Sequence, residues 1–501
     1  MGTAAAWAHR LAVPARLHGH RLNPHLISTV ILIGHWLLVI GLSVRVITRR
    51  FPVGVAVAWL AIMFSLPLVG AVAYLLLGEK RLGRRHRRRA AAAQAALRVW
   101  QQTLPAPGNR PAGVDQASEL QRLARTISGF PPQSGHQVRL LDHCSAIFDV
   151  LIADIDSARQ CCHLSFYIWH AEGRMADVLG ALRRAAERGL DCRALADALG
   201  SREFLASPAA QALRQAGVDL RATLPGGLLG ALWSRIDLRN HRKIAVIDGR
   251  VAYAGSQNLV DPAHFRQSAG VGEWVDAMLR ITGPAAQALD AVFEFDWSAE
   301  TGAAFRGPVA DIQGAAGSDG TVLQLAPSGP DLQPEVIHDL LLAAIYGARQ
   351  SIAMTTPYFV PDDALLTALL TAARRGVEVC LIVPARNDSR MVRLASASCF
   401  EPLLAAGVSI ALFRGGLLHT KSLVIDRSIS VFGSVNLDMR SFWLNFEISL
   451  LVYDADFAAQ LRHLQQGYLL DSDRVDLAIW RQRPRSRQFA ESAFRLLGPL
   501  L

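Results

Sequence analysis

Two long apolar stretches dominate the pattern of hydrophobic and polar positions at the start of the chain. Residues 26–44 are interrupted only by His35 and a few small polar residues, and residues 53–77 form a second, longer apolar run. At ~1.5 Å per residue, a helix over the first stretch spans the hydrocarbon layer of a bilayer. The link between the stretches, which carries Arg45 and Arg49, is too short to be a domain. The pattern therefore predicts two transmembrane helices joined by a tight turn.

A strongly basic segment follows the second apolar run. Residues 80–89 contain seven Lys and Arg residues. Because basic segments next to membrane spans stay in the cytoplasm, both chain ends and the rest of the protein are expected to face the cytoplasm. We therefore predict that residues 1–89 form two transmembrane helices and a basic juxtamembrane segment. A cleaved signal peptide is disfavoured, because the apolar run is too long and lacks a small-residue cleavage site.

Beyond this region the pattern is that of an α/β protein, and it occurs twice. A short run of aromatic and β-branched residues at 165–169 has a counterpart at 356–360. An amphipathic helix that ends in basic residues and a glycine, followed by an apolar strand, occurs at 185–195 and again at 372–382. Repeated strand–helix–strand order predicts βαβ units and parallel or mixed sheets.

The fold class predicted is α/β, with two pseudo-symmetric lobes whose mixed sheets are flanked by helices. Residues 90–135 are expected to form an amphipathic helix and a linker rich in Pro and Gly. The first lobe is predicted over 136–313 and the second over 320–501. A stretch rich in Gly, Ala and Ser near 314–320 joins them.

Charge and cysteine content exclude several classes of protein. The 501 residues carry a net charge of +10, but residues 1–89 alone account for +12, so residues 90–501 sum to −2. The large part of the chain therefore lacks the cationic track that nucleic-acid binding requires. Six cysteines without CxxC spacing predict ordinary buried thiols rather than a disulfide scaffold or a zinc site.

Each half of the chain carries the same pattern, H-x-K-x4-D-x6-G-S-x-N. Only three of the 501 residues are lysines, and two of them stand two positions after a histidine. Chance would produce roughly 0.1 such triplets in this composition. The motif residues are His241, Lys243, Asp248, Ser256 and Asn258 in the first copy, and His419, Lys421, Asp426, Ser434 and Asn436 in the second.

The spacing of the first copy predicts a cradle for an anion. His241 and Lys243 share one face of a strand, and Asn258 joins them from the returning strand with Ser256 beside it. The same holds for the second copy. Asp248 belongs to the motif and is a catalytic candidate, as is Asp426 in the second copy. However, seven residues of extended chain measure about 23 Å, which favours a turn or supporting role over contact with the imidazole.

Carboxylates that orient the imidazole rings are therefore sought elsewhere. Each repeat offers one in a later apolar strand, Asp276 in the first and Glu447 in the second. A histidine paired with a carboxylate keeps one ring nitrogen available for chemistry. An ion pair at the surface or between the lobes is the alternative interpretation of these two acids.

Two copies of the motif, brought together, make one site for displacement at phosphorus. One histidine attacks the phosphorus and the other protonates the leaving alkoxide, while two Lys and two Asn side chains hold the non-bridging oxygens. No cluster of acids has the spacing of a Mg²⁺ or Ca²⁺ site. We therefore predict that the protein needs no metal and no cofactor.

These motifs resemble the phospholipase D superfamily, and more narrowly the bacterial cardiolipin synthases. The resemblance rests on the paired H-x-K-x4-D motifs and on the segments 237–243, 355–361, 436–442 and 444–447, and it extends to the double N-terminal apolar run. It implies a phosphohistidine intermediate between two pseudo-symmetric lobes. It also implies that His241 and His419 are nucleophile and acid/base, with His241 the usual nucleophile in the family.

The implied reaction transfers a phosphatidyl group from one phosphatidylglycerol to another and releases glycerol. The expected partners are phosphatidylglycerol, other anionic membrane lipid and the bilayer, with no nucleic acid. The expected location is the bacterial inner (cytoplasmic) membrane, as a multi-pass protein with its catalytic lobes in the cytoplasm. A hydrolytic phospholipase D is the main alternative, and a catalytically silent lipid-binding scaffold is a second.

Overall fold

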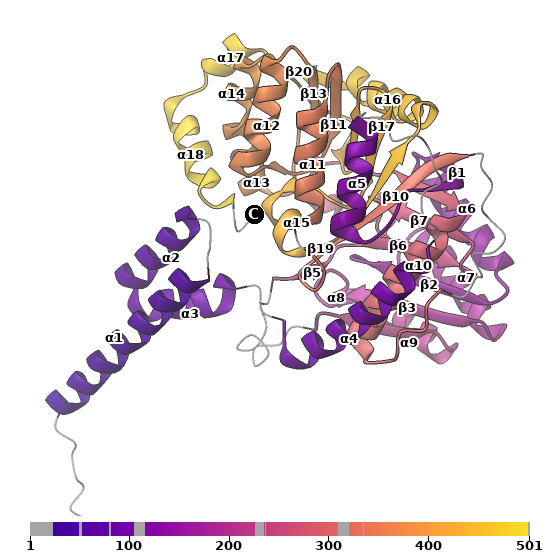
Figure 1. Ribbon diagram of the computed structural model, residues 1–501, viewed down its shortest axis with the longest axis horizontal. Helices are drawn as coiled ribbons and strands as arrows, with labels where there is room; N and C mark the ends of the chain where they lie inside the picture. Colours follow the sequence, from indigo (N-terminus) through magenta and orange to yellow (C-terminus); the bar gives the residue numbers. More distant parts are fainter. Residues whose placement is uncertain are drawn as a thin grey trace, which may run out of the picture. The chain divides into compact units, whose positions relative to one another are not determined.

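The structure is a computed structural model that divides into two compact units, Met1–Glu79 and Lys80–Leu501 (Figure 1). Each unit is described by itself. The described residues are 24–49, 53–79, 82–104, 116–225, 235, 237–308, 320–333 and 335–498.

The first unit consists of helices with a break in the second apolar run. Helix α1 spans Pro24–Thr48, α2 spans Val53–Ser65 and α3 spans Pro67–Ala73, followed by a π-helical turn at Tyr74–Gly78. The second run is therefore not one helix. It breaks before Pro67, because proline has no backbone N–H and its ring clashes with the carbonyl of the preceding turn.

A buried carboxylate closes the end of this unit. Glu79 accepts hydrogen bonds from Arg45 Nε at 2.5 Å and Nη2 at 2.8 Å, and from the Tyr74 hydroxyl at 2.9 Å. These contacts join the end of the π-helical turn to the last turns of α1. Across the part of the chain that is described, no helix has both the length and the apolar content to cross a membrane.

The second unit is built on one continuous sheet with a pseudo-two-fold arrangement. Strand β1 of the first lobe pairs antiparallel with β10 of the second, with Gln133 opposite Leu323, so the predicted lobe sheets merge into one sheet of 16 strands over the described residues. In sheet order, the first lobe contributes β1 (Gln133–Leu141), β9 (Met278–Thr282), β7 (Val251–Gly255), β6 (Lys243–Ile247), β2 (Cys161–Phe166), β3 (Asp191–Asp197) and β4 (Asp219–Thr223). The second contributes β10 (Thr321–Ser328), β19 (Asn445–Tyr453), β17 (Ile429–Gly433), β16 (Ser422–Ile425), β11 (Ser351–Thr355), β13 (Glu378–Pro384), β14 (Ser409–Phe413) and β20 (Ser472–Arg474).

Helices cover both faces of this sheet, which explains why the central strands are apolar on both sides. One face is covered by α4 (Arg84–Gln101), α10 (Pro284–Thr301) and α16 (Ala455–Leu470). The other is covered by α6 (Cys144–Ser157), α7 (Met175–Glu187) and α9 (Pro208–Gln215) in the first lobe, and by α5 (Gln116–Ser128), α11 (Val336–Gly347), α12 (Asp363–Arg374) and α14 (Phe400–Ala405) in the second. The remaining helices are α8 (Arg202–Leu205), η3 (Gln267–Ala269), α13 (Arg390–Ser398), α15 (Met439–Trp443), α17 (Leu477–Arg481) and α18 (Arg485–Arg495).

Several predicted segments have different limits in the structure. The aromatic strand expected at 165–169 is β2, which ends at Phe166, so that Tyr167 follows the strand. The basic segment continues into α4, whose side chains Ala90 and Leu97 are buried in the core that contains α10. The linker predicted around 105–113 and most of the joining stretch near 314–320 lie outside the described residues.

Three short parallel strand pairs join parts of the chain that are far apart in sequence. Two of them connect the lobes. Strand β5 (Arg239–Asn240) pairs with β19, and β15 (Leu417–Leu418) pairs with β8 (Trp274–Val275). The third pairs β12 (Phe359–Val360) with β18 (Leu437–Asp438). Because β5 and β15 directly precede the two H-x-K motifs, each motif begins against a strand of the opposite lobe.

Candidate active site

Each H-x-K motif stands at the start of a hairpin, and the motif aspartate stands in the turn at its far end. Asp248 and Asp426 have φ angles of 52° and 48°, in the left-handed region, where Asp is tolerated better than most residues. Each carboxylate accepts hydrogen bonds from consecutive backbone N–H groups that lead into a neighbouring strand. The donors are Arg159, Gln160 and Cys161 for Asp248, and Arg349, Gln350 and Ser351 for Asp426.

These contacts separate the two aspartates from the chemistry. Asp248 is at the opposite end of β6 from His241, and its two oxygens are occupied by main-chain donors. Asp426 is placed in the same way relative to β16. Their inclusion among the catalytic candidates is thus not supported by contact with the imidazoles. The geometry fits the supporting role that their distance along the strand indicated.

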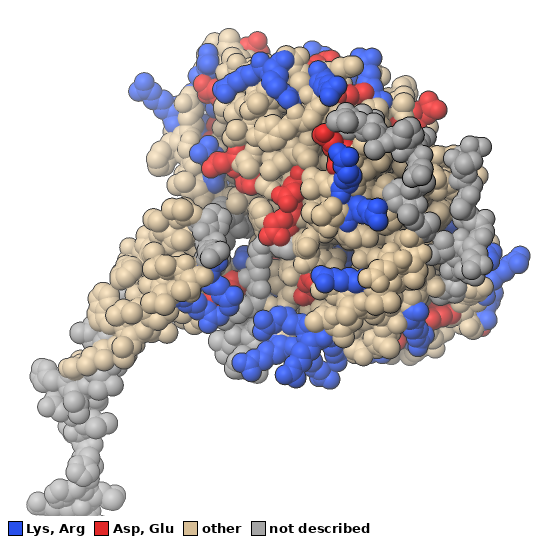
Figure 2. Space-filling model, viewed as in Figure 1, with Lys and Arg blue, Asp and Glu red and all other residues tan. Residues whose placement is uncertain are grey.

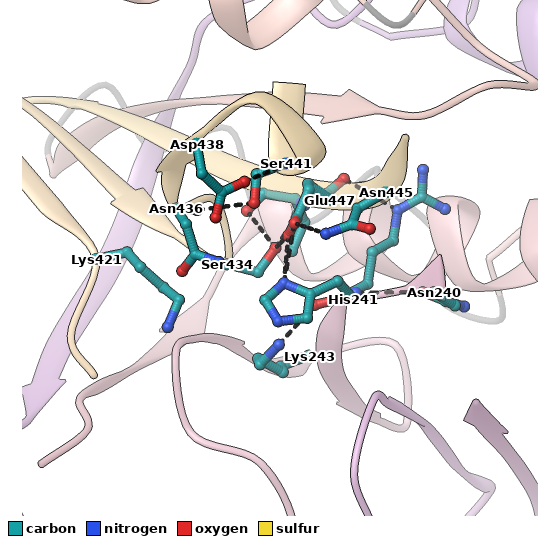
Figure 3. A network of polar contacts seen from close by, with 12 residues as sticks. Asn240, His241, Lys243, Lys421, Ser434, Asn436, Asp438, Ser441, Asn445 and Glu447 are labelled. Atoms are coloured by element: carbon teal, nitrogen blue, oxygen red, sulfur yellow. Dashed lines mark hydrogen bonds and ion pairs between the residues drawn. The ribbon is translucent and has the colours of Figure 1, made fainter. Parts of the chain in front are cut away.

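The two histidines form crossed pairs with carboxylates of the opposite lobe. His241 Nδ1 lies 2.9 Å from the Glu447 carboxylate (Figure 3). His419 Nδ1 lies 2.6 Å from Asp276 Oδ1. The crossing follows from the pairings of β5 with β19 and of β15 with β8. A carboxylate on Nδ1 leaves Nε2 of each ring available as nucleophile or acid. Both lobes are therefore needed to complete either histidine.

The motif serines support the carboxylates. Ser434 Oγ donates to Glu447 Oε2 at 2.5 Å, and Asn445 Nδ2 donates to Oε1 of the same residue at 3.1 Å (Figure 3). In the first lobe, Ser256 Oγ accepts from the backbone N–H of Ala277 at 3.1 Å, next to Asp276. The serines predicted to stand beside the phosphate thus hold the residues that orient the imidazoles.

The motif asparagines retain polar atoms without a hydrogen-bond partner. Asn258 Oδ1 accepts from the Ile168 backbone N–H at 3.2 Å, whereas its Nδ2 is buried and unpaired. Asn436 is buried in the second lobe, and its Oδ1 is also unpaired. Buried polar groups in native proteins nearly always have partners. An unpaired buried amide donor at Asn258 is what a site for an anionic oxygen requires.

Burial favours the neutral form of both imidazoles. It lowers the pKa of His241 to about 4, although the contact with Glu447 acts in the opposite direction. It lowers the pKa of His419 to about 3, again against the effect of Asp276. Neutral imidazoles at physiological pH are ready for nucleophilic attack. A bound anion would raise both pKa values and favour the protonated form that an acid needs.

The two lysines are the cations of the site. Burial lowers the pKa of Lys243 to about 8 and that of Lys421 to about 7. Lys421 helps to lower the pKa of His241, and Lys243 that of His419, so each ammonium acts on the imidazole of the opposite lobe. The four side chains of the two motifs therefore share one electrostatic environment.

Two aromatic side chains that the sequence analysis did not assign to the site lie against the imidazoles. Tyr167 lies 5.0 Å from His241 between ring centroids, and Trp274 lies 4.4 Å from His419. Trp274 stands two positions before Asp276, on the short strand that crosses to the other motif. The sequence signal that could have identified these two residues is an aromatic residue within the strand run at 165–169 and another two positions before the candidate carboxylate Asp276.

The middle residue of each motif holds the main chain beside the opposite carboxylate. Arg242 is fully buried and donates from Nε to the Glu447 carbonyl at 3.1 Å and from Nη2 to the Ser328 carbonyl at 3.0 Å. It also forms an ion pair with Asp296 of α10. Thr420 Oγ1 donates to the carbonyl of Val275, directly before Asp276, at 3.2 Å. The sequence analysis missed both residues, because it followed only the strand face shared by His and Lys.

Thr420 Oγ1 also lies 3.0 Å from the Tyr468 hydroxyl. We expect Thr420→Val to lower kcat about fivefold with little change in KM, because the change keeps the shape of the side chain and removes the hydrogen bond to the Val275 carbonyl, worth about 1 kcal/mol, together with the contact to Tyr468. Thr420→Ser, which retains the hydroxyl, is the matched control and should stay within about twofold of the parent. Steady-state kinetics of both variants check this. Equal kcat values for the two variants would show that the hydroxyl does not position Asp276.

Comparisons with known proteins identify the family to which this fold belongs. The family model described as cardiolipin synthase, phospholipase D-like domain matches residues 151–297 and 341–466. A model described as phospholipase D-nuclease N-terminal matches residues 37–79. The solved phosphatidylserine synthase of Haemophilus influenzae superposes with a TM-score of 0.56 at 15% identity, over 76% of this chain and all of that one, and this likeness concerns the fold alone. Fold and motifs together define an enzyme of the phospholipase D-like class.

Similarity to curated proteins is much closer in sequence. Cardiolipin synthase A of Cronobacter sakazakii is 43% identical over 479 residues, which cover 95% of this chain and 99% of that protein. Cardiolipin synthase A of Citrobacter koseri is 42% identical over the same length. The chain therefore belongs to the cardiolipin synthase family.

Proposed function

We propose that the protein synthesises cardiolipin by transferring the phosphatidyl group of one phosphatidylglycerol to a second, with release of glycerol. The observation that carries this proposal is the pair of crossed histidine–carboxylate contacts, because a two-step displacement at phosphorus needs two imidazoles at one site. Membership of the family supports the choice of lipid substrate.

In the first step, Nε2 of one histidine attacks the phosphorus of phosphatidylglycerol. An N–P bond forms and the P–O bond to the glycerol headgroup breaks, while the second imidazolium donates its proton to the leaving oxygen. The carboxylate on Nδ1 of the attacking ring stabilises the positive charge that this ring acquires. Glycerol leaves, and a phosphatidyl-histidine remains.

In the second step, the other imidazole, now neutral, accepts the proton from a free hydroxyl of a second phosphatidylglycerol. The hydroxyl oxygen attacks phosphorus, the P–O bond of cardiolipin forms and the N–P bond breaks. We infer that Lys243, Lys421 and Asn258 hold the non-bridging oxygens as negative charge develops in both steps, which the two buried ammonium groups and the unpaired Nδ2 of Asn258 support. No proton or electron is left over.

We also propose that the first unit anchors the protein in the bacterial cytoplasmic membrane, with the catalytic unit in the cytoplasm. Large apolar side chains are exposed on its helices, among them Leu37 and Ile47 on α1, Val53 on α2 and Val69 on α3. A lipid environment would cover such side chains. The basic residues that follow the unit favour the cytoplasmic side.

The test is to incubate the purified full-length protein with phosphatidylglycerol in detergent, with and without EDTA, and to identify the products by mass spectrometry. We expect cardiolipin and glycerol in equal amounts, with and without EDTA, because the lysines supply the positive charge. Phosphatidic acid without cardiolipin would instead establish a hydrolase. The anchor is tested separately, before the protein is extracted with detergent, by washing the membranes of the producing cells with alkaline carbonate. We expect the protein to stay in the membranes, and its loss into the wash would argue against the anchor.

A further inference from the structure

The last two helices form a surface whose exposed side chains are basic and apolar. Between residues 477 and 498 there are five arginines and one acid, Glu491. Glu491 is 1% exposed and is held by Arg483 Nη2 at 3.0 Å and Arg487 Nε at 3.1 Å. The only acid of this segment is thereby turned inward and neutralised. A second carboxylate at the surface, Glu401 of α14, is paired with Arg481 at 3.3 Å. Figure 2 shows blue basic side chains, with some red acidic ones between them, along the edge of the second lobe where α17 and α18 lie in Figure 1.

The apolar side chains of this surface lie in one line along α18. Phe489 is 77% exposed and Leu496, just beyond the helix, is 79% exposed. Arg485, Phe489 and Leu496 follow the i, i+4, i+11 spacing of one helix face. The buried Glu491 lies two positions from Phe489, on the opposite face, toward α13. Ile479 on α17 adds a further exposed apolar side chain.

The opposite face of α18 is packed close to the active site. Phe494 packs on Val360 and Val392. Val360 is the register partner of Asp438, which follows the motif residue Asn436 by two positions and lies beside it in Figure 3. The inner face of α18 therefore packs on β12, and β12 pairs with β18, which directly follows the motif residue Asn436.

We propose that α17, α18 and Leu496–Leu497 form a docking surface for an anionic phospholipid bilayer, which holds the active site at the level of the lipid headgroups. The exposed arginines of this surface complement anionic headgroups. A helix that lies in a membrane interface typically exposes aromatic and leucine side chains along one face with basic side chains beside them, as α18 does. The proposal rests on the proposed function only in its choice of an anionic lipid as the surface. It is independent of the anchor in the first unit.

The direct test places an environment-sensitive fluorophore on Phe489→Cys in the full-length protein, reconstituted into vesicles of phosphatidylcholine alone or mixed with phosphatidylglycerol. Quenching by neutral acrylamide should fall about threefold when phosphatidylglycerol is present. Tyr346→Cys on α11, also an exposed aromatic position, is the control and should be quenched equally in both vesicles. The unsubstituted protein gives the labelling background of the native cysteines.

Equal quenching at position 489 in the two vesicle types would overturn the proposal. Protection in phosphatidylcholine and in detergent as well would overturn it too, because another part of the protein would then cover the surface.

A kinetic arm distinguishes this proposal from the proposed function. Phe489→Ser with Leu496→Ser should raise the KM for phosphatidylglycerol about fivefold in vesicles, leave kcat unchanged, and leave the activity in detergent micelles unchanged. Leu199→Ser, which removes an exposed leucine of the first lobe, is the matched control. An unchanged KM in vesicles overturns the docking surface. Absence of cardiolipin from the parent protein in micelles would instead overturn the proposed function.

Discussion

Replacing either histidine of the site, His241→Asn or His419→Asn, is expected to lower kcat by at least about 10⁴-fold. One imidazole must form the bond to phosphorus and the other must carry the proton, so neither can replace the other. Asparagine keeps a polar side chain of similar size in the buried site. Cardiolipin formation from phosphatidylglycerol, followed by mass spectrometry, measures the loss, and circular dichroism shows whether the variants fold.

A mixture of the two inactive variants sharpens this test. Because β5 pairs with β19 and β15 pairs with β8 within one chain, both motifs of a molecule complete a single site. Mixing His241→Asn protein with His419→Asn protein should therefore restore no activity. Recovery of activity in the mixture would mean that the site is shared between two chains, and near-normal activity of either variant alone would disprove a common site.

The composition of the site was predictable from the sequence, whereas its connections were not. The motif spacing identified His241, Lys243 and their counterparts, and the lone acids in apolar strands identified Asp276 and Glu447. The structure assigns Glu447 to His241 and Asp276 to His419. This crossing depends on two short strand pairs that bring together contacts 206 and 143 positions apart, for which local sequence carries no periodic signal.

The same limit applies to the fold. Periodicity predicted the repeated βαβ units, but the merging of the two lobes into one sheet depends on β1 and β10 meeting at the pseudo-two-fold axis. Helix α5 was missed because its predominantly polar sequence buries only Leu120 and Ala124. By contrast, the break in the second apolar run could have been predicted locally, because Pro67 interrupts a helix. The prediction of one continuous helix relied on hydropathy alone, and hydropathy does not register a proline within an apolar run.

Removing either orienting carboxylate, by Glu447→Gln or Asp276→Asn, is expected to lower kcat by about 10²- to 10⁴-fold while KM changes little. Each change keeps a hydrogen-bond partner for Nδ1 but removes the charge that stabilises the imidazolium. Asp290→Asn is the matched control, because Asp290 forms an equally buried contact with His163, at 2.6 Å, outside the site. It should lower the melting temperature without changing the pH profile.

The pH profiles of the two variants also assign the roles of the histidines. Each carboxylate raises the pKa of its partner imidazole, so removing it lowers that pKa further. For the nucleophile, which must be neutral, the acid limb of kcat/KM then moves to lower pH. For the acid, which must be protonated, the alkaline limb moves to lower pH and activity near pH 7 is lost. If Glu447→Gln moves the acid limb and Asp276→Asn the alkaline limb, His241 is the nucleophile, and the reverse result assigns this role to His419. Unchanged limbs in both variants would show that the crossed carboxylates do not control the protonation of the site.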